Sequence, residues 1–210
     1  LLPRIEIALS QIRYNARILS ELHEKKGISL MGVSKATLGD PEIAKAMIQG
    51  GVKFIADSRI ENIQKMKNAG VSTQFVLLRT ALSQAEAVIR NVDISLNTEL
   101  KTVRELSRYA KIYHTTHQII IMVEMGDLRE GILPCDLSQF IKSILGLPSI
   151  KIIGIGCNLA CYGGIKPDAQ KMWELSKLAD AIEKEFKINL EIISGGNSAN
   201  YEWYESALSC

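Results

Sequence analysis

Short apolar runs rich in β-branched residues recur along the chain, and a helical pattern follows most of them. Each run is nearly continuous in its apolarity, which is typical of strands covered on both faces in a parallel sheet. A strand followed by a helix, repeated this often, indicates the α/β class. The runs predicted as strands are 4–9, 28–34, 52–57, 73–79, 92–97, 117–124, 150–156 and 189–194.

Capping residues mark the helices between these runs. Asp40 is a predicted N-cap, with Pro41 at the first helical position. Ser58 is a predicted N-cap for the next helix, because Glu61 three residues later completes a capping box. The longest helix is predicted over 168–186, with apolar residues at helical spacing.

The repeated alternation favours a (β/α)8 barrel, and an open doubly wound sheet is the alternative. No Pro-, Gly- or Ser-rich linker divides the chain, so residues 1–210 are predicted to form one domain. The dinucleotide fingerprint GxGxxG is absent, since GIGCNL at 154–159 lacks the third glycine.

The charge balance argues against two classes of partner. With 25 basic and 23 acidic residues the net charge is only +2, so we expect neither a nucleic-acid partner nor a membrane partner. No apolar run approaches the roughly 18 residues of a membrane span. CNLAC at 157–161 has no second Cys or His pair to complete a zinc site, so no metal is expected. Reduced thiols indicate a cytoplasmic protein.

Lys35 directly follows the apolar run at 28–34, five residues before the N-cap of the next helix. In a (β/α)8 barrel the chemistry lies at the C-terminal ends of the strands. Partial burial at such a position would favour the neutral, nucleophilic amine of a Schiff-base lysine. An ordinary surface lysine is the alternative.

The segment SGGNSAN at 194–200 follows the last predicted strand and leads into a short helix predicted at 199–208. Two glycines allow a tight turn, and Asn197 with Ser198 would offer N–H groups, an amide and a hydroxyl to an anion. In barrels of this type the loops of the last strands often bind phosphate. An imine-forming lysine together with a phosphate site suggests pyridoxal 5'-phosphate (PLP), although an ordinary Gly-rich turn is the alternative.

Four segments resemble the alanine/ornithine racemase family of fold type III PLP enzymes, and in particular its ornithine-racemase-like branch. They are GVSKATLGDPE (32–42), GDLREGI (126–132), NLACYGG (158–164) and SGGNSAN (194–200). The resemblance extends over nearly the whole chain. It implies a barrel that binds PLP and an activity that inverts the α-carbon of an amino acid.

The resemblance also implies roles for individual residues. Lys35 would bind PLP as an imine and act as one catalytic base. Arg129 would lie near the phenolic oxygen of the cofactor and the substrate carboxylate. Asn158 would occupy the place where alanine racemases have a histidine beside the pyridine ring, which puts a ring-stacking role in doubt. Asn197 and Ser198 would bind the cofactor phosphate.

Members of the family continue into a β-rich second domain. By resemblance, the strand at 4–9 would belong with that domain, and the eighth barrel strand would follow residue 210. The chain is therefore expected to be an incomplete barrel, the N-terminal fragment of a homodimeric enzyme. The opposite-face base, a tyrosine of the partner subunit in this family, would lie outside the chain, so the activity of the fragment alone is open.

The substrate class suggested by the resemblance is ornithine or another amino acid with a polar tail. Glu124 and Asp127 could receive a distal ammonium ion, and Ser34 and Asn97 could line the pocket. Three other functions stay open: a non-catalytic, single-barrel protein of PLP homeostasis, a lyase acting on D-amino acids, and a PLP-free sugar-phosphate enzyme.

Overall fold

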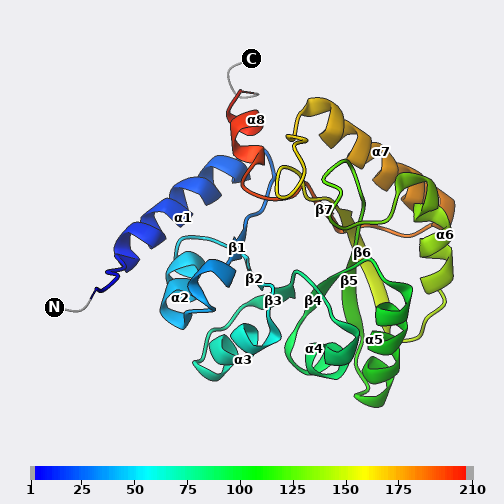
Figure 1. The fold of residues 1–210 in the computed structure, drawn as a ribbon, viewed down its shortest axis with the longest axis horizontal. Coiled ribbons are helices and arrows are strands. Elements are labelled where there is room, and N and C mark those ends of the chain that lie inside the picture. The colour runs from blue at the N-terminus through cyan, green and yellow to red at the C-terminus, as the bar shows by residue number, and fades with distance from the viewer. Residues whose placement is uncertain (1–2, 207–210) are drawn as a thin grey trace. The chain divides into compact units, whose positions relative to one another are not determined.

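A computed structural model describes residues 3–206, in which strands and helices alternate (Figure 1). Two short 3-10 helices, η1 (Lys35–Thr37) and η2 (Leu82–Gln84), interrupt the alternation. The strands are β1 (Met31–Val33), β2 (Phe54–Asp57), β3 (Gln74–Leu77), β4 (Ile94–Asn97), β5 (His117–Met122), β6 (Ile150–Gly156) and β7 (Ile192–Ser194). The α-helices are α1 (Leu9–Glu24), α2 (Pro41–Gln49), α3 (Ile60–Asn68), α4 (Ala85–Asn91), α5 (Leu100–Ile112), α6 (Pro134–Ile144), α7 (Ala169–Phe186) and α8 (Asn200–Ser206).

The strand order in the sheet, β1-β2-β3-β4-β5-β6-β7, is the order of the chain. The pairs β1–β2, β2–β3, β5–β6 and β6–β7 are parallel. Sequential parallel strands separated by helices are the topology of a (β/α)8 barrel, and residues 3–206 supply seven of its strands. The predicted fold class is confirmed. The open doubly wound alternative is wrong, because its strand order would reverse at a switch point.

The described residues divide into two compact units, 3–79 with 90–94, and 80–89 with 95–206. In the first unit, α1 packs against α2, and α2 packs against α3. Ile55, Ile63 and Phe75 are among the side chains buried in its core.

In the second unit, α5 contacts α6 and α6 contacts α7 along one side of β5 and β6 (Figure 1). Its core includes Leu106, Ile119, Ile121, Leu137 and Ile141, all fully buried. The pairing of β5 with β6 shifts register between Ile119 and Ile120, so one extra residue of β6 is accommodated there.

Two local predictions were wrong. The first concerns residues 4–8, which lie outside any strand, and α1 begins at Leu9. Within 3–206 these residues have no neighbouring strand to supply the hydrogen bonds that a strand needs, and Ile5 is 90% exposed.

The second concerns the start of α3, where the N-cap is Arg59 rather than Ser58. Arg59 makes no side-chain cap hydrogen bond, and its own backbone N–H donates to Asp57 Oδ1 at 2.9 Å, which holds the chain entering α3.

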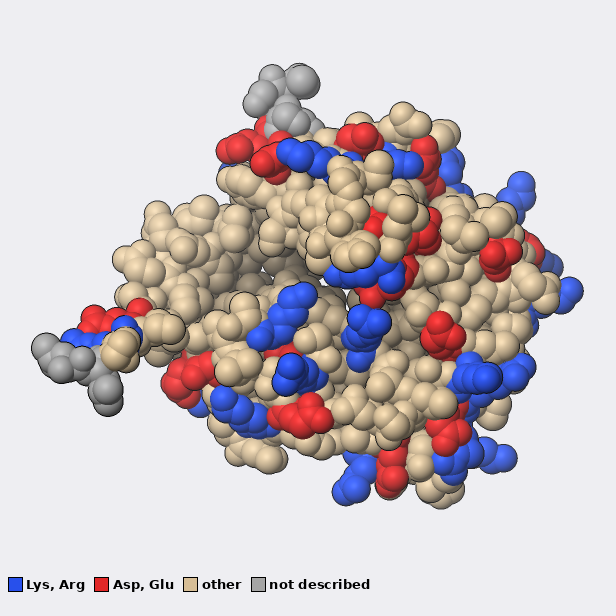
Figure 2. Space-filling model, in the orientation of Figure 1, with Lys and Arg blue, Asp and Glu red and all other residues tan. Residues whose placement is uncertain are grey.

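On the face drawn in Figure 2, acidic and basic side chains both occur and are interspersed. This distribution agrees with the net charge of +2. Within residues 3–206, no helix combines the length and the apolarity that crossing a membrane would require.

Candidate functional site

Lys35 is the first residue of η1, immediately beyond the end of β1. Its side chain is exposed and has no hydrogen-bond or ion-pair partner among residues 3–206. The expectation of partial burial was therefore wrong. The reason lies in β1, which stands at the end of the strand order, pairs within residues 3–206 only with β2, and leaves Val33 45% exposed.

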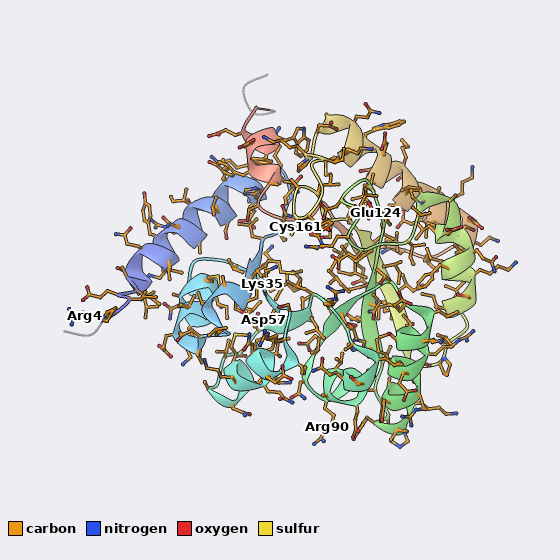
Figure 3. All side chains as sticks on the ribbon, in the orientation of Figure 1. Arg4, Lys35, Asp57, Arg90, Glu124 and Cys161 are labelled. Atoms are coloured by element: carbon orange, nitrogen blue, oxygen red, sulfur yellow. The ribbon has the colours of Figure 1, made fainter. Side chains whose placement is uncertain are left out.

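The backbone before Lys35 is fixed by a buried polar cluster. The hydroxyl of Ser34 donates to Asp57 Oδ2 at 2.7 Å, and both residues are fully buried. Asp57 Oδ1 accepts from Asn62 Nδ2 at 2.9 Å. Lys35 consequently stands beside Asp57 at the ends of β1 and β2 (Figure 3). Its amine is free while its main chain is anchored to β2 and α3.

A tight turn returns the chain from Lys35 to α2. Thr37 Oγ1 donates to the carbonyl of Ser34 at 3.0 Å. Gly39 has a φ of +60°, and a Cβ at this position would lie 2.6 Å from Asn62 Cβ. Only glycine therefore fits between η1 and α3. The same Asn62 that binds Asp57 thus also packs against this turn.

Arg129 lies in the second unit, in the loop after β5. Its Nη2 donates to Glu130 Oε1 at 2.6 Å, and its Nη1 donates to Cys161 Sγ at 2.6 Å. Burial by itself would lower the pKa of Arg129, but the hydrogen bond and charge of Glu130 outweigh it and raise that pKa. The guanidinium is therefore a fixed positive charge, 27% exposed, that can meet an anion.

Asp127 and Glu124 are occupied by the backbone of the same loops. Asp127 Oδ1 accepts from the N–H groups of Cys161, Tyr162 and Gly163 at 3.0, 3.0 and 2.9 Å. Burial would raise the pKa of Asp127, but these donors and the nearby Arg129 charge hold it below its ordinary value.

Glu124 Oε1 accepts from the N–H groups of Gly126 and Leu128 at 2.5 and 3.1 Å. The structure thus gives Glu124 and Asp127 a loop-holding role. That role accounts for both carboxylates without the distal ammonium ion that the sequence suggested for them.

Asn158 and Asn197 come from neighbouring loops of the second unit. Asn158 Nδ2 donates to Glu130 Oε1 at 3.1 Å. Asn197 Nδ2 donates to the carbonyl of Leu159 at 2.9 Å, and its Oδ1 accepts from Ala199 N at 2.8 Å. The loop after β7 is thereby attached to the loop after β6.

Ser198 lies at the tip of the loop after β7 and is exposed. Its hydroxyl and its backbone N–H have no hydrogen-bond partner within 3–206. Both groups are therefore available to a ligand.

Asn97, predicted as a pocket residue, is 3% exposed. Its Nδ2 donates to the carbonyl and the hydroxyl of Ser95, each at 2.9 Å, while its Oδ1 has no hydrogen-bond partner in the described part of the chain. Ser95 Oγ also lies 2.8 Å from His117 Nε2. His117 and Ser95 were not predicted from the sequence, because they are 22 residues apart and meet only in the folded chain.

The predicted residues thus fall into two groups. Arg129 and Asn158 are joined through Glu130, and Asn197 is joined to the loop of Asn158 through Leu159. Lys35 belongs to the first unit and is held there by Ser34 and Asp57. Among residues 3–206, no group of three or more His, Cys, Asp and Glu side chains is arranged to hold a metal ion.

Comparison with known proteins gives a consistent set of relatives. The chain is 40% identical over 200 residues to the ornithine racemase of Acetoanaerobium sticklandii, covering 94% of this chain and 56% of that protein. It is 37% identical over 200 residues to the lysine racemase of Thermotoga maritima, covering 93% and 55%. The chain spans about half the length of the curated relatives that it matches.

Solved structures agree on the fold. The alanine racemase of Clostridium difficile 630 superposes with a TM-score of 0.76 at 21% identity, over 90% of this chain and 54% of that one. Residues 7–210 match the family described as alanine racemase, N-terminal domain, which confirms the resemblance found in the sequence. The chain belongs to this alanine racemase N-terminal domain family.

Proposed function

We propose that the chain is the PLP-binding barrel domain, residues 1–210, of an amino-acid racemase of the alanine/ornithine type. The observation that carries this proposal is the free amine of Lys35, held on an anchored turn at the end of β1. It occurs in a chain 40% identical to an ornithine racemase and 37% identical to a lysine racemase. We therefore favour ornithine or lysine over alanine as the substrate.

The residues present have the chemistry that PLP requires. An unpartnered primary amine, Lys35, can condense with the aldehyde of the cofactor. The free hydroxyl and N–H of Ser198, beside Asn197, suit a phosphate. The guanidinium of Arg129 suits a phenolate oxygen or a carboxylate, and Asn158 offers an amide to the ring.

When bound, PLP delocalises the negative charge that remains on a substrate after its α-proton is removed. Lys35 Nζ would accept or return that proton on one face of the α-carbon. Arg129, Asn197 and Ser198 would orient the bound groups. Inversion needs a second base on the opposite face, which we assign to a partner subunit in a cytoplasmic homodimer. Residues 4–8, which lie outside any strand within 3–206, would belong with a second domain.

The first test is covalent trapping. The chain is mixed with PLP, reduced with borohydride and digested, and the modified peptide is identified by mass spectrometry. We expect the adduct on Lys35, its loss in Lys35→Ala, and its retention in Lys101→Ala, because Lys101 is an exposed lysine on α5. An adduct spread over many lysines, or unchanged in Lys35→Ala, would contradict the assignment.

The second test is turnover. Single enantiomers of ornithine, lysine and alanine are incubated with the complete gene product and PLP, and both enantiomers are measured by chiral chromatography. We expect ornithine and lysine to racemise faster than alanine. Trapping at Lys35 without racemisation of any of the three would instead indicate a PLP-homeostasis protein.

A further inference from the structure

The sequence assigned Glu130 no role, yet this residue connects two residues to which it did assign one. Its Oε1 accepts from Arg129 Nη2 at 2.6 Å and from Asn158 Nδ2 at 3.1 Å. The Glu130 side chain is 18% exposed, so water competes only weakly for these bonds. One carboxylate oxygen thus receives a donor from the loop after β5 and another from the loop after β6.

The backbone that carries Glu130 is fixed on the strand before it. The N–H of Glu124 donates to the carbonyl of Ile132 at 2.9 Å, and the N–H of Ile132 donates to the carbonyl of Met122 at 2.8 Å. Gly131 makes this return possible with a φ of +126°. The carboxylate is therefore presented from a rigid turn, in contrast to a carboxylate on a freely moving loop.

Arg129 needs such an anchor because an arginine side chain has many rotamers. Its Nε is buried without a hydrogen bond to any of the described residues and lies 3.8 Å from Asp127 Oδ2, and the contact of Nη1 with Cys161 Sγ is to a weak acceptor. The charge-assisted bond to Glu130 is accordingly the strongest interaction that Arg129 makes within residues 3–206. The amide of Asn158 makes its hydrogen bond to the same atom.

We propose that Glu130 is a positioning residue: it holds Arg129 and Asn158 in the orientation in which both meet the cofactor and the substrate. This inference rests on the proposed function for its ligand. The coupling of Glu130 to Arg129 can be tested without that ligand.

The variants are Glu130→Ala, which removes both hydrogen bonds, and Glu130→Gln, which keeps an acceptor oxygen without the charge. Glu191→Ala is the matched control, because Glu191 pairs with Lys151 on the exposed surface of the same unit. Each Glu130 change is also made in an Arg129→Ala background, so that a double-mutant cycle isolates the coupling. Thermal unfolding verifies that every variant is folded.

The first readout is the affinity for PLP, measured by absorbance titration. Loss of a hydrogen bond to a charged group weakens binding by about tenfold or more. We expect a loss of PLP affinity of this size for Glu130→Ala and a smaller loss for Glu130→Gln. In the Arg129→Ala background the effect of Glu130→Ala should be smaller, because only the hydrogen bond to Asn158 is then lost. Equal effects in both backgrounds, or an affinity as unchanged as in Glu191→Ala, would overturn the proposal.

The second readout needs no PLP. Cys161 contacts Arg129, so the rate at which iodoacetamide modifies Cys161, followed by peptide mass spectrometry, reports the placement of the guanidinium. We expect Glu130→Ala to raise this rate severalfold in the Arg129 background and to leave it unchanged when Arg129 is alanine. An unchanged rate in the Arg129 background refutes the positioning role. Absence of PLP binding by the parent chain would refute the proposed function instead.

Discussion

At the scale of single residues, the second unit contains a titratable side chain that takes no part in the proposed chemistry. His117 is 3% exposed, and its Nε2 lies 2.8 Å from Ser95 Oγ. The amide of Asn97 donates to that same hydroxyl, whose own hydrogen is available for Nε2 of a neutral imidazole. Burial lowers the pKa of His117 to about 4.

The low pKa of His117 makes stability depend on pH. In the unfolded chain His117 is protonated as the pH falls below its ordinary pKa of 6.5. In the folded chain it is protonated only near pH 4. The free energy of unfolding should therefore fall by about 3 kcal/mol between pH 7 and pH 4 through this residue. Urea unfolding of the parent chain and of His117→Gln at several pH values measures the difference. Identical pH dependence in the two proteins would contradict this assignment.

Gly131 is a second residue with a measurable consequence. A Cβ there would lie 2.3 Å from the backbone nitrogen of Glu124, and the φ of +126° disfavours any L side chain. We expect Gly131→Ala to lower the free energy of unfolding by about 2 kcal/mol or more. Gly146 has open space at its Cβ and no positive φ, so Gly146→Ala should change stability by about 0.5 kcal/mol at most. Chemical denaturation of the pair gives the comparison, and equal values would argue against strain at Gly131.

Individual site residues could be predicted where their position relative to a predicted strand or helix was enough to select them. Lys35 could be selected because it follows an apolar run and precedes a cap. The partners of Asp57, Glu130 and His117 could not be predicted, since they are 23, 28 and 22 residues away and are set by tertiary packing. The exposure of Lys35 was also mispredicted, because neighbouring apolar residues do not reveal that β1 has a single partner strand in the described part of the chain.

At the scale of elements, α2 illustrates a boundary that local chemistry determines. Asp40 Oδ1 accepts from the N–H groups of Glu42 and Ile43 at 2.9 and 3.1 Å, as expected of an N-cap. Replacing Asp40 by alanine should cost about 1 kcal/mol of folding free energy.

The control for this cap is Asp136, an acidic residue in the first turn of α6. The N-cap of α6 is Leu133, which makes no side-chain cap hydrogen bond. Asp136→Ala should cost only a few tenths of a kcal/mol, by roughly the magnitude of a surface charge–dipole effect. Thermal and urea unfolding distinguish the two variants. A cost for Asp136→Ala equal to that of Asp40→Ala would remove the capping explanation.

Helices and strands whose own residues favour them were predicted correctly. A strand that needs a neighbouring strand for its hydrogen bonds could not be predicted from its own residues. Seven of the eight apolar runs contain strands, and the helix predicted at 168–186 is α7 (Ala169–Phe186). The run at 4–9 has a strand composition, but composition cannot supply the missing neighbour. The cap of α3 was misplaced by one residue, because α3 begins at Ile60 and its N-cap Arg59 makes no side-chain cap hydrogen bond.

At the scale of the whole molecule, the fold class could be predicted from the alternation of strand and helix patterns along the sequence. Repeated strand–helix units with short loops predict sequential parallel strands, and the observed strand order is sequential. The site was less predictable than the fold. Loop residues can be recognised at the strand ends, but the hydrogen bonds that orient them join loops from different units of the repeat.

The sequential strand order also has a consequence during protein synthesis. Each strand pairs with the one made just before it, so its hydrogen-bonding partner has already emerged when the strand leaves the ribosome. Loop closure then involves only nearby segments, which favours rapid, progressive assembly from the N-terminal end. The growing chain can therefore add one strand and one helix at a time, before residues far along the sequence have been synthesised.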